Sequence, residues 1–332
     1  MNKQLSVFFA ENEWVKPALG FLGLFVLCIV FSPVSSKGTL IFLKFDNLSN
    51  VLRQVSEIGI ISVGMTLVIL TGGIDLSVGS VLGLSATATA FGLMDWRLGF
   101  FGAIGVALAL GAGAGFVNGA ITSAGKIQSF IVTLAMMTGA RGFALFLSDA
   151  NSRNIGFGEN AAPESFKIFT ESFFGVPFPV YIFLAVAVVA AIVLRKTRFG
   201  RHIFAVGGNQ TAARLSGVNV ALTRTVAFTV AGFLSGLAGV VHAAQLYQGN
   251  PNDGVGFELD AIAAVVVGGA SLMGGKGSME GTIAGVLIIG VLSNILGLHG
   301  VEKDFQLMLK GAIIVAAVLM QERRWSFRNK GA

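Results

Sequence analysis

The chain has 332 residues, of which 54% are hydrophobic and only 12% are charged. A soluble globular domain carries about 25% charged residues, so this composition excludes an ordinary soluble protein and predicts that most of the chain lies in lipid. The net charge of +6 does not indicate nucleic acid, because the basic residues flank apolar runs and act as topology signals. The single cysteine, Cys28, excludes a disulfide framework.

Apolar runs long enough to cross a membrane recur along the whole sequence. A transmembrane helix needs about 17 to 25 predominantly apolar residues. We expect about ten such spans, near residues 17–33, 54–71, 76–93, 98–118, 128–148, 176–194, 225–243, 257–272, 279–298 and 305–321. The first run lacks a small-residue cleavage site, so we interpret it as an anchoring span and not as a removable signal peptide. The sequence therefore predicts an all-α integral membrane protein, with residues 1–332 forming a single polytopic domain.

The basic residues between these runs predict an orientation. If the N-terminus lies in the cytoplasm, the cytoplasmic segments hold fourteen Lys and Arg residues and the outer segments hold seven. Cytoplasmic loops of membrane proteins carry such an excess. We therefore expect both termini in the cytoplasm. The longest outer segment, about 149–175, contains Asp149, Glu159, Glu164 and Glu171, and it is either an ordinary solvated loop or a docking surface for an external partner.

Two glycine-containing breaks interrupt the apolar pattern in a similar way. Residues 72–76 and residues 268–272 both follow the pattern Gly-Gly-x-x-Leu. Unwound backbone in a transporter offers polar groups to a cargo, so we predict that these breaks lie on the translocation path. The path residues that we expect are Gly72, Gly73, Asp75, Ser77, Gly268 and Gly269. Asp75 and Ser77 have an equally good second interpretation, in which they cap the span that follows them.

Charged residues within or next to the spans are few. Glu258 and Asp260 open the eighth span, where acidic residues suit the helix dipole. Arg141 and Lys310 are cations inside spans, and each can pair with a carboxylate such as Asp75 or Asp260. We expect Asp75 to be the only acid deep in the membrane.

Glycines also recur at helix-packing spacing. Such Gly-x-x-x-Gly steps place glycines on one helix face, where a second backbone can approach closely. They occur at Gly111, Gly115 and Gly119, at Gly232 and Gly236, and at Gly281 and Gly285.

Residues 195–224 form a polar segment between two apolar runs, with six of the chain's 23 basic residues and no acidic residue. The excess of positive charge predicts a cytoplasmic location. Asn209 is a predicted N-cap, Gln210 to Ser216 form a short helix, and Gly217 can take the left-handed conformation that ends a helix. A small capped helix between two spans is typical of a docking element, so we expect a membrane subunit driven by a cytoplasmic partner.

Motifs for catalysis or nucleotide binding are absent from the sequence. The segment 269–278 resembles a phosphate-binding loop, but Ala270 replaces the first glycine and Gly277 replaces the Ser or Thr that should follow Lys276. Neither His-Glu-x-x-His nor Gly-x-Ser-x-Gly occurs. We therefore expect no catalytic residue, no metal site and no cofactor on this chain, with ATP and magnesium bound by a partner.

Three segments together resemble a known family. Thr71 to Ser80 is similar to the signature of the ribose-type sugar permeases of bacterial ATP-binding-cassette (ABC) importers, within the branched-chain amino acid/ribose permease superfamily. Residues 199–217 resemble that family's cytoplasmic coupling segment, and residues 258–275 resemble its third landmark. The resemblance covers about residues 45–320. It implies that the following residues couple the chain to an ATPase: Gly200, Arg201, Ala205, Gly207, Asn209, Ala212, Ala213, Ser216 and Gly217.

The resemblance also implies an assembly. We expect a homodimer of permeases in the bacterial cytoplasmic (inner) membrane, with a lumen between the two copies. A cytoplasmic ATPase grips the coupling helix, and a periplasmic binding protein delivers the sugar. ATP binding and hydrolysis in the partner then swing the spans between outward-open and inward-open states, and the lumen holds the sugar only weakly.

Three alternatives remain open from the sequence. The first is an ion-coupled secondary transporter of a small polar solute, which usually needs several intramembrane acids. The second is a membrane enzyme or a passive scaffold. The third is an ABC permease whose cargo is a small polyhydroxylated molecule other than a sugar.

Overall fold

The computed structural model describes residues 14–158, 161–302 and 304–313, together with isolated positions 315, 316 and 319. Glu159 and part of the predicted span 305–321 lie outside the described residues. The described part is an all-α membrane protein, as the composition predicted, and each of the first nine predicted spans overlaps a helix. The helices are α2 (Val15–Val30), α3 (Phe45–Leu70), α4 (Val78–Met94), α5 (Gly99–Ala124), α6 (Ser129–Leu147), the 3₁₀ helix η1 (Glu164–Phe169), α7 (Phe178–Lys196), α8 (Arg198–Gly208), α9 (Gln210–Leu215), α10 (Val220–Leu246), α11 (Phe257–Val267) and α12 (Met279–Leu298).

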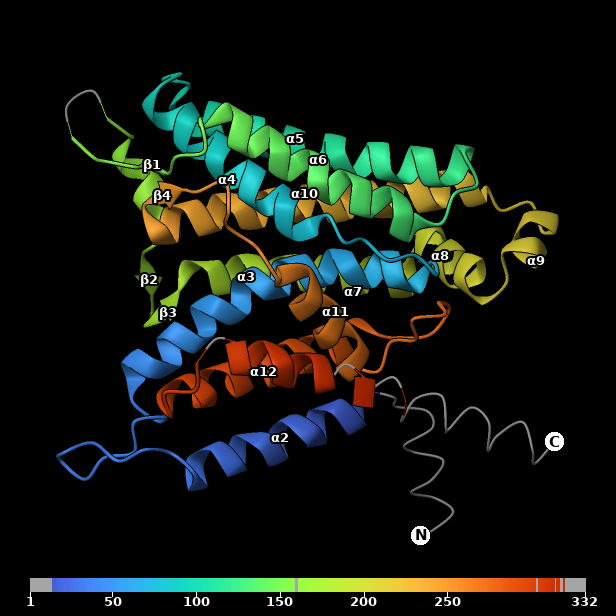
Figure 1. The fold of residues 1–332 in the computed structure, drawn as a ribbon. Helices are drawn as coiled ribbons and strands as arrows, with labels where there is room; N and C mark the ends of the chain where they lie inside the picture. The colour runs from blue at the N-terminus through green and yellow to red at the C-terminus, as the bar shows by residue number, and fades with distance from the viewer. Residues whose placement is uncertain (1–13, 159–160, 303, 314, 317–318, 320–332) are drawn as a thin grey trace, which may run out of the picture.

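Sheet structure in the described residues is limited to two small antiparallel strand pairs and two isolated bridges. β1 (Arg153–Asn154) pairs with β4 (Gln248–Gly249), and β2 (Ser172–Phe173) pairs with β3 (Val176–Pro177). These strands lie at the end of the bundle opposite α8 and α9 (Figure 1). The predicted cytoplasmic segment 195–224 and the predicted outer segment 149–175 therefore lie at opposite ends of the molecule.

Six of the described helices are long and apolar enough to cross a membrane alone: α3, α5, α6, α7, α10 and α12. Two apolar helices, α2 and α4, are shorter. α11 has only 11 residues, which is about 16 Å of helix and too short to span a bilayer by itself. Within the predicted span 257–272, the helix therefore covers only residues 257–267, and the remainder is irregular. α11 ends at Val267 because Gly268 follows it and Gly269 adopts a left-handed φ of 95°.

The centre of the bundle is formed by α3 and α10, which are largely buried, whereas α5 and α6 leave most of their apolar surface exposed. Exposed side chains such as Phe101 and Phe146 suit contact with lipid tails.

Glycine steps hold α5 directly against α10, as their spacing predicted. A Cβ atom on Gly115 would lie 2.2 Å from the Phe228 carbonyl oxygen, and one on Gly232 would lie 2.2 Å from the Gly111 carbonyl oxygen. The pair Gly281 and Gly285 brings α12 equally close to the backbone of α11. At such distances only glycine lets the two helices meet backbone to backbone.

Candidate functional site

The predicted coupling helix is present with both of its predicted ends. The Asn209 side-chain oxygen accepts a hydrogen bond of 2.9 Å from the Ala212 amide, so Asn209 caps α9. α9 ends at Leu215, and Gly217 has the left-handed φ of 82° that was expected. The sequence reasoning missed the helix before it, α8. Its signal was available, because Thr197 accepts a hydrogen bond from the Gly200 amide and caps α8.

The nine predicted coupling residues divide into an exposed set and a packed set. Six of them are exposed and are free to contact a partner: Arg201, Ala205, Asn209, Ala212, Ser216 and Gly217. Gly200 and Ala213 are buried, and Gly207 is half-buried. α9 and the neighbouring loop also expose two apolar side chains that the sequence reasoning did not select, Leu215 and Met273.

Gly207 packs the end of α8 against two other backbone segments. A Cβ atom on Gly207 would lie 1.8 Å from the Leu70 carbonyl oxygen and 2.4 Å from the Gly275 amide nitrogen. These two groups hydrogen-bond to each other at 3.0 Å. The end of α8, the end of α3 and the loop after α11 therefore form one tight junction, which we call the coupling junction.

The first glycine break adjoins this junction. Gly72 has a left-handed φ of 75°, and a Cβ atom on Gly274 would lie 2.8 Å from the Gly72 amide nitrogen. The second glycine break does not lie at this junction as a whole, because Gly268 packs against the Gly281 carbonyl oxygen of α12. The structure thus brings Gly72 to the segment that follows Gly269, but Gly268 serves the contact between α11 and α12.

Residues 71–77, between α3 and α4, are not helical, and side chains from neighbouring helices satisfy their backbone. The Ile74 amide donates to the Ser129 hydroxyl at 3.0 Å, and the Thr133 hydroxyl donates to the Ile74 carbonyl oxygen at 3.2 Å. Unsatisfied backbone groups are costly in a membrane, so these two side chains of α6 stabilise the break.

Asp75 lies in this segment and is only 1% exposed. Its carboxylate accepts hydrogen bonds from the Ser77 amide at 2.8 Å and from the Ser77 hydroxyl at 2.6 Å, directly before α4. The Asn118 side chain of α5 donates to the same hydroxyl at 2.9 Å. These contacts hold Asp75 locally against Ser77, the residue that precedes α4, but no side chain caps the first amides of α4, so the predicted capping role is not found.

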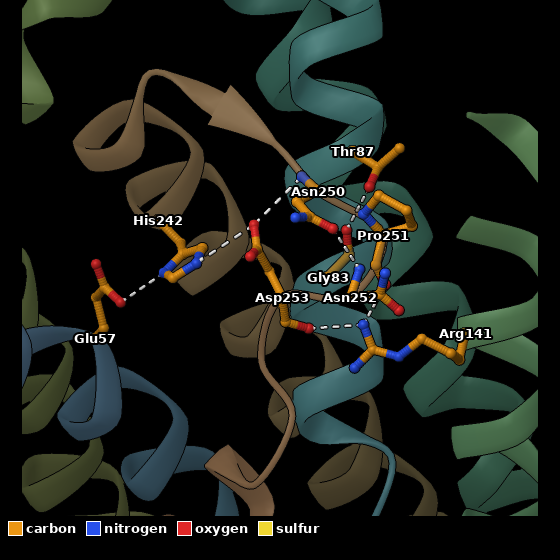
Figure 2. A network of polar contacts seen from close by, with 9 residues as sticks. All are labelled: Glu57, Gly83, Thr87, Arg141, His242, Asn250, Pro251, Asn252 and Asp253. Carbon is orange, nitrogen blue, oxygen red and sulfur yellow. Dashed lines mark hydrogen bonds and ion pairs between the residues drawn. The ribbon is translucent and has the colours of Figure 1, made fainter. Parts of the chain in front are cut away.

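A second irregular segment, residues 250–256, follows β4 at the opposite end of the bundle (Figure 1) and packs along α4 (Figure 2). A Cβ atom on Gly83 would lie 2.6 Å from the Asp253 carbonyl oxygen, and one on Gly254 would lie 2.3 Å from the Gly79 carbonyl oxygen. Both halves of the protein therefore contribute a stretch of unwound backbone next to α4.

Arg141 of α6 holds this second segment. Its guanidinium group donates to the carbonyl oxygens of Pro251 and Asp253, the latter at 2.7 Å (Figure 2). Arg141 forms no close ion pair with Asp75 or Asp260, the two carboxylates named as examples, and its hydrogen-bond partners are backbone carbonyls. The corresponding expectation for Lys310 is confirmed, because its ammonium group lies 2.8 Å from the Asp260 carboxylate.

A row of three titratable side chains was missed by the sequence reasoning. His242 of α10 lies between Glu57 of α3, at 2.8 Å, and Asp253, at 3.5 Å (Figure 2). Glu57 is 6% exposed and Asp260 is 7% exposed, so the expectation that Asp75 is the only deep acid is also wrong. The signal was the presence of Glu57 and His242 inside two predicted apolar spans.

In the described part of the chain, no group of three or more His, Cys, Asp or Glu side chains has an arrangement that could hold a metal ion.

Comparison with known proteins identifies relatives along nearly the whole chain. The ribose import permease protein RbsC of Escherichia coli K12 is 43% identical over 314 residues, which cover 94% of this chain and 96% of that relative. RbsC of Bacillus subtilis is 43% identical over 305 residues, which cover 92% of each chain. The D-allose transport system permease protein AlsC of Escherichia coli K12 is 36% identical over 296 residues, or 89% of each chain. No solved structure matches the chain.

The family described as "Branched-chain amino acid transport system / permease component" matches residues 47–318. This range contains the coupling junction, both irregular segments and the polar contacts of Arg141 and His242. The chain belongs to this family of transport-system permeases.

Proposed function

We propose that the chain is the permease subunit of an ABC importer that moves a monosaccharide such as ribose across the bacterial cytoplasmic membrane. The observation that carries this proposal is the coupling junction. There the exposed helices α8 and α9 are joined to the end of α3 by a direct backbone contact at Gly207, just before the break at Gly72. The names of the relatives, which include ribose and D-allose permeases, support the sugar as cargo.

The proposed mechanism is mechanical, and the chain itself catalyses no reaction. An ATPase subunit binds α9 and moves it when ATP is bound and hydrolysed. Because Gly207 leaves no side chain between α8 and the Leu70 carbonyl, this movement reaches the break at Gly72 directly. The sugar then passes along a path that includes Gly72, Gly73, Asp75, Ser77, Gly268 and Gly269.

The assembly that we propose contains two copies of this chain, a cytoplasmic ATPase and a periplasmic binding protein that supplies the sugar. Each copy crosses the membrane about ten times with both termini in the cytoplasm. Nucleotide and magnesium belong to the ATPase.

Exposed apolar side chains at the α9 end add a docking contact. Leu215 is 85% exposed and Met273 is 84% exposed, and both lie on the side of the molecule that carries the predicted coupling residues. Apolar side chains that are exposed to water beside a docking helix fit a protein interface.

Co-purification from the native membrane in mild detergent tests the proposal. We expect an ATPase subunit in a roughly matching amount, and less of it with Leu215→Ser than with Leu222→Ser, a control on α10. In proteoliposomes with the ATPase and the binding protein, sugar uptake should require ATP. An intact chain that purifies alone, with uptake that survives ATP depletion but stops with an ionophore, would instead establish an ion-coupled carrier.

A further inference from the structure

A cavity of about 630 Å³ lies at the α9 end of the bundle, apart from the polar row around His242. Its walls come from the break at Gly72 and Ile74, from the connection between α5 and α6, from α9 and from the first turns of α10. We call it the basic cavity. Its polar lining includes Thr122, Lys126, Gln128, Ser129, Arg214 and Arg224.

The lining carries three cations and no carboxylate. Lys126, Arg214 and Arg224 come from three different parts of the chain, and none of them forms an ion pair with another described residue. An excess of basic residues alone is ordinary for a cytoplasmic surface. Three of them around one hollow, without a balancing acid, create a positive potential inside it.

Two buried polar atoms in the same walls lack hydrogen-bond partners among the described residues. They are Nε of Arg224 and the hydroxyl oxygen of Thr122, whose side chain is only 1% exposed. Leaving such atoms unpaired costs free energy, so a small turn of either side chain that brings its donor to a group bound in the cavity is favoured.

The first turn of α6 adds further donors. Gln128, Ser129 and Phe130 line the cavity, and the start of α6 has no side-chain cap. The first amides of a helix have no partner inside the helix, and the helix dipole makes this end favourable for an anion. The donors are thus cationic side chains, a hydroxyl group and helix amides, which together suit phosphate.

We propose that the basic cavity binds a phosphate ester. A phosphorylated monosaccharide fits it, because the volume lies within the about 300 to 1,000 Å³ of small-molecule pockets and exceeds what a phosphate group needs. Gln128, Ser129 and Gln210 supply amide and hydroxyl groups for sugar hydroxyls. An anionic lipid headgroup offers the same phosphate chemistry from a second source.

Occupation of the cavity has a consequence for transport that rests on the proposed function. Gly72 and Ile74 on one wall belong to the proposed path, and Gln210 and Arg214 on another belong to α9. A ligand that contacts both walls resists their relative movement. We therefore expect a phosphorylated sugar on the cytoplasmic side to slow import.

The test measures binding apart from transport. The full chain, alone and assembled with its ATPase, is placed in phosphatidylcholine nanodiscs and titrated calorimetrically with ribose 5-phosphate, inorganic phosphate and unmodified ribose. We expect saturable binding of ribose 5-phosphate in both preparations and none of ribose. Arg224→Gln and Lys126→Gln should each weaken binding about tenfold or more. Lys196→Gln, an exposed cation outside the cavity, should leave it unchanged.

A separate experiment tests whether the bound phosphate group belongs to a lipid. In nanodiscs with phosphatidylglycerol, native mass spectrometry would show a retained lipid that Arg224→Gln releases, and ribose 5-phosphate would compete with it. Binding that neither cavity variant weakens, or that disappears when the ATPase assembles, would overturn the proposal. Thermal unfolding of each variant confirms that it folds. Failure of ATP-driven uptake would contradict the proposed function but leave this binding result intact.

Discussion

Replacing Gly207 by alanine is the sharpest perturbation that the coupling junction allows. The new Cβ atom would stand 1.8 Å from the Leu70 carbonyl oxygen, where real Cβ atoms keep at least 3.0 Å. The two backbones must therefore separate by about 1.2 Å, because neither partner is a flexible side chain. The same displacement strains the hydrogen bond between the Gly275 amide and the Leu70 carbonyl.

Overpacking of this kind costs about 1 to 3 kcal/mol, which corresponds to roughly a 5- to 150-fold change in an equilibrium between two states. We expect Gly207→Ala to lower ATP-driven sugar uptake by a factor in this range, with less effect on ATP hydrolysis, because movement of α9 no longer reaches the break at Gly72.

The matched control is the neighbouring glycine. A Cβ atom on Gly208 meets nothing within 4 Å, so Gly208→Ala makes the same chemical change on the same helix without a clash. Uptake and hydrolysis are measured in proteoliposomes that contain equal amounts of folded permease. Equal uptake by the two variants would refute the argument that Gly207 transmits the movement.

Three further predictions concern the membrane-spanning part. Gly115→Ala should lower the thermal stability of the purified protein, because its Cβ would lie 2.2 Å from a backbone oxygen of α10, whereas Gly113→Ala points into open space and should be neutral. Arg141→Gln should cost about 1 to 3 kcal/mol in a chemical unfolding experiment, because it leaves backbone carbonyls without a donor; an unchanged unfolding midpoint would contradict this. Asp75→Asn should keep most of the stability that Asp75→Ala loses, because the amide oxygen can still accept from the Ser77 amide; equal loss in both would show that the charge is needed.

Local features of this chain were predictable from the sequence, and the reason is that local chemistry determines them. The apolar runs predicted the apolar helices α2 to α7 and α10 to α12, Asn209 and Gly217 predicted the ends of α9, and the Gly-x-x-x-Gly steps predicted the close contact between α5 and α10. Each depends on residues a few positions apart or on one helix face.

Features that depend on distant partners were not predictable. Residues 71–77 stay unwound because Ser129 and Thr133, more than fifty residues later, satisfy the Ile74 backbone. Arg141 binds carbonyl oxygens that lie 110 and 112 residues away in the chain. A backbone carbonyl leaves no mark in a sequence, so these hydrogen bonds of Arg141 could not be read from its spacing to any acidic residue.

The deep carboxylates bear on the choice between the two kinds of transporter. Their number alone favours an ion-coupled carrier, which usually places several acids along a relay. The hydrogen-bond and ion-pair partners of these carboxylates instead favour an ABC permease. Glu57 is bonded to His242, Asp260 to Lys310 and Asp75 to Ser77, so each has a local structural partner. A relay needs acids that can release and accept an ion along a path, whereas acids held by fixed partners join helices to one another. The polar row around His242 therefore fits a clamp that fixes the unwound segment 250–256 between α3 and α10, and the energy for transport must then enter elsewhere, through α8 and α9.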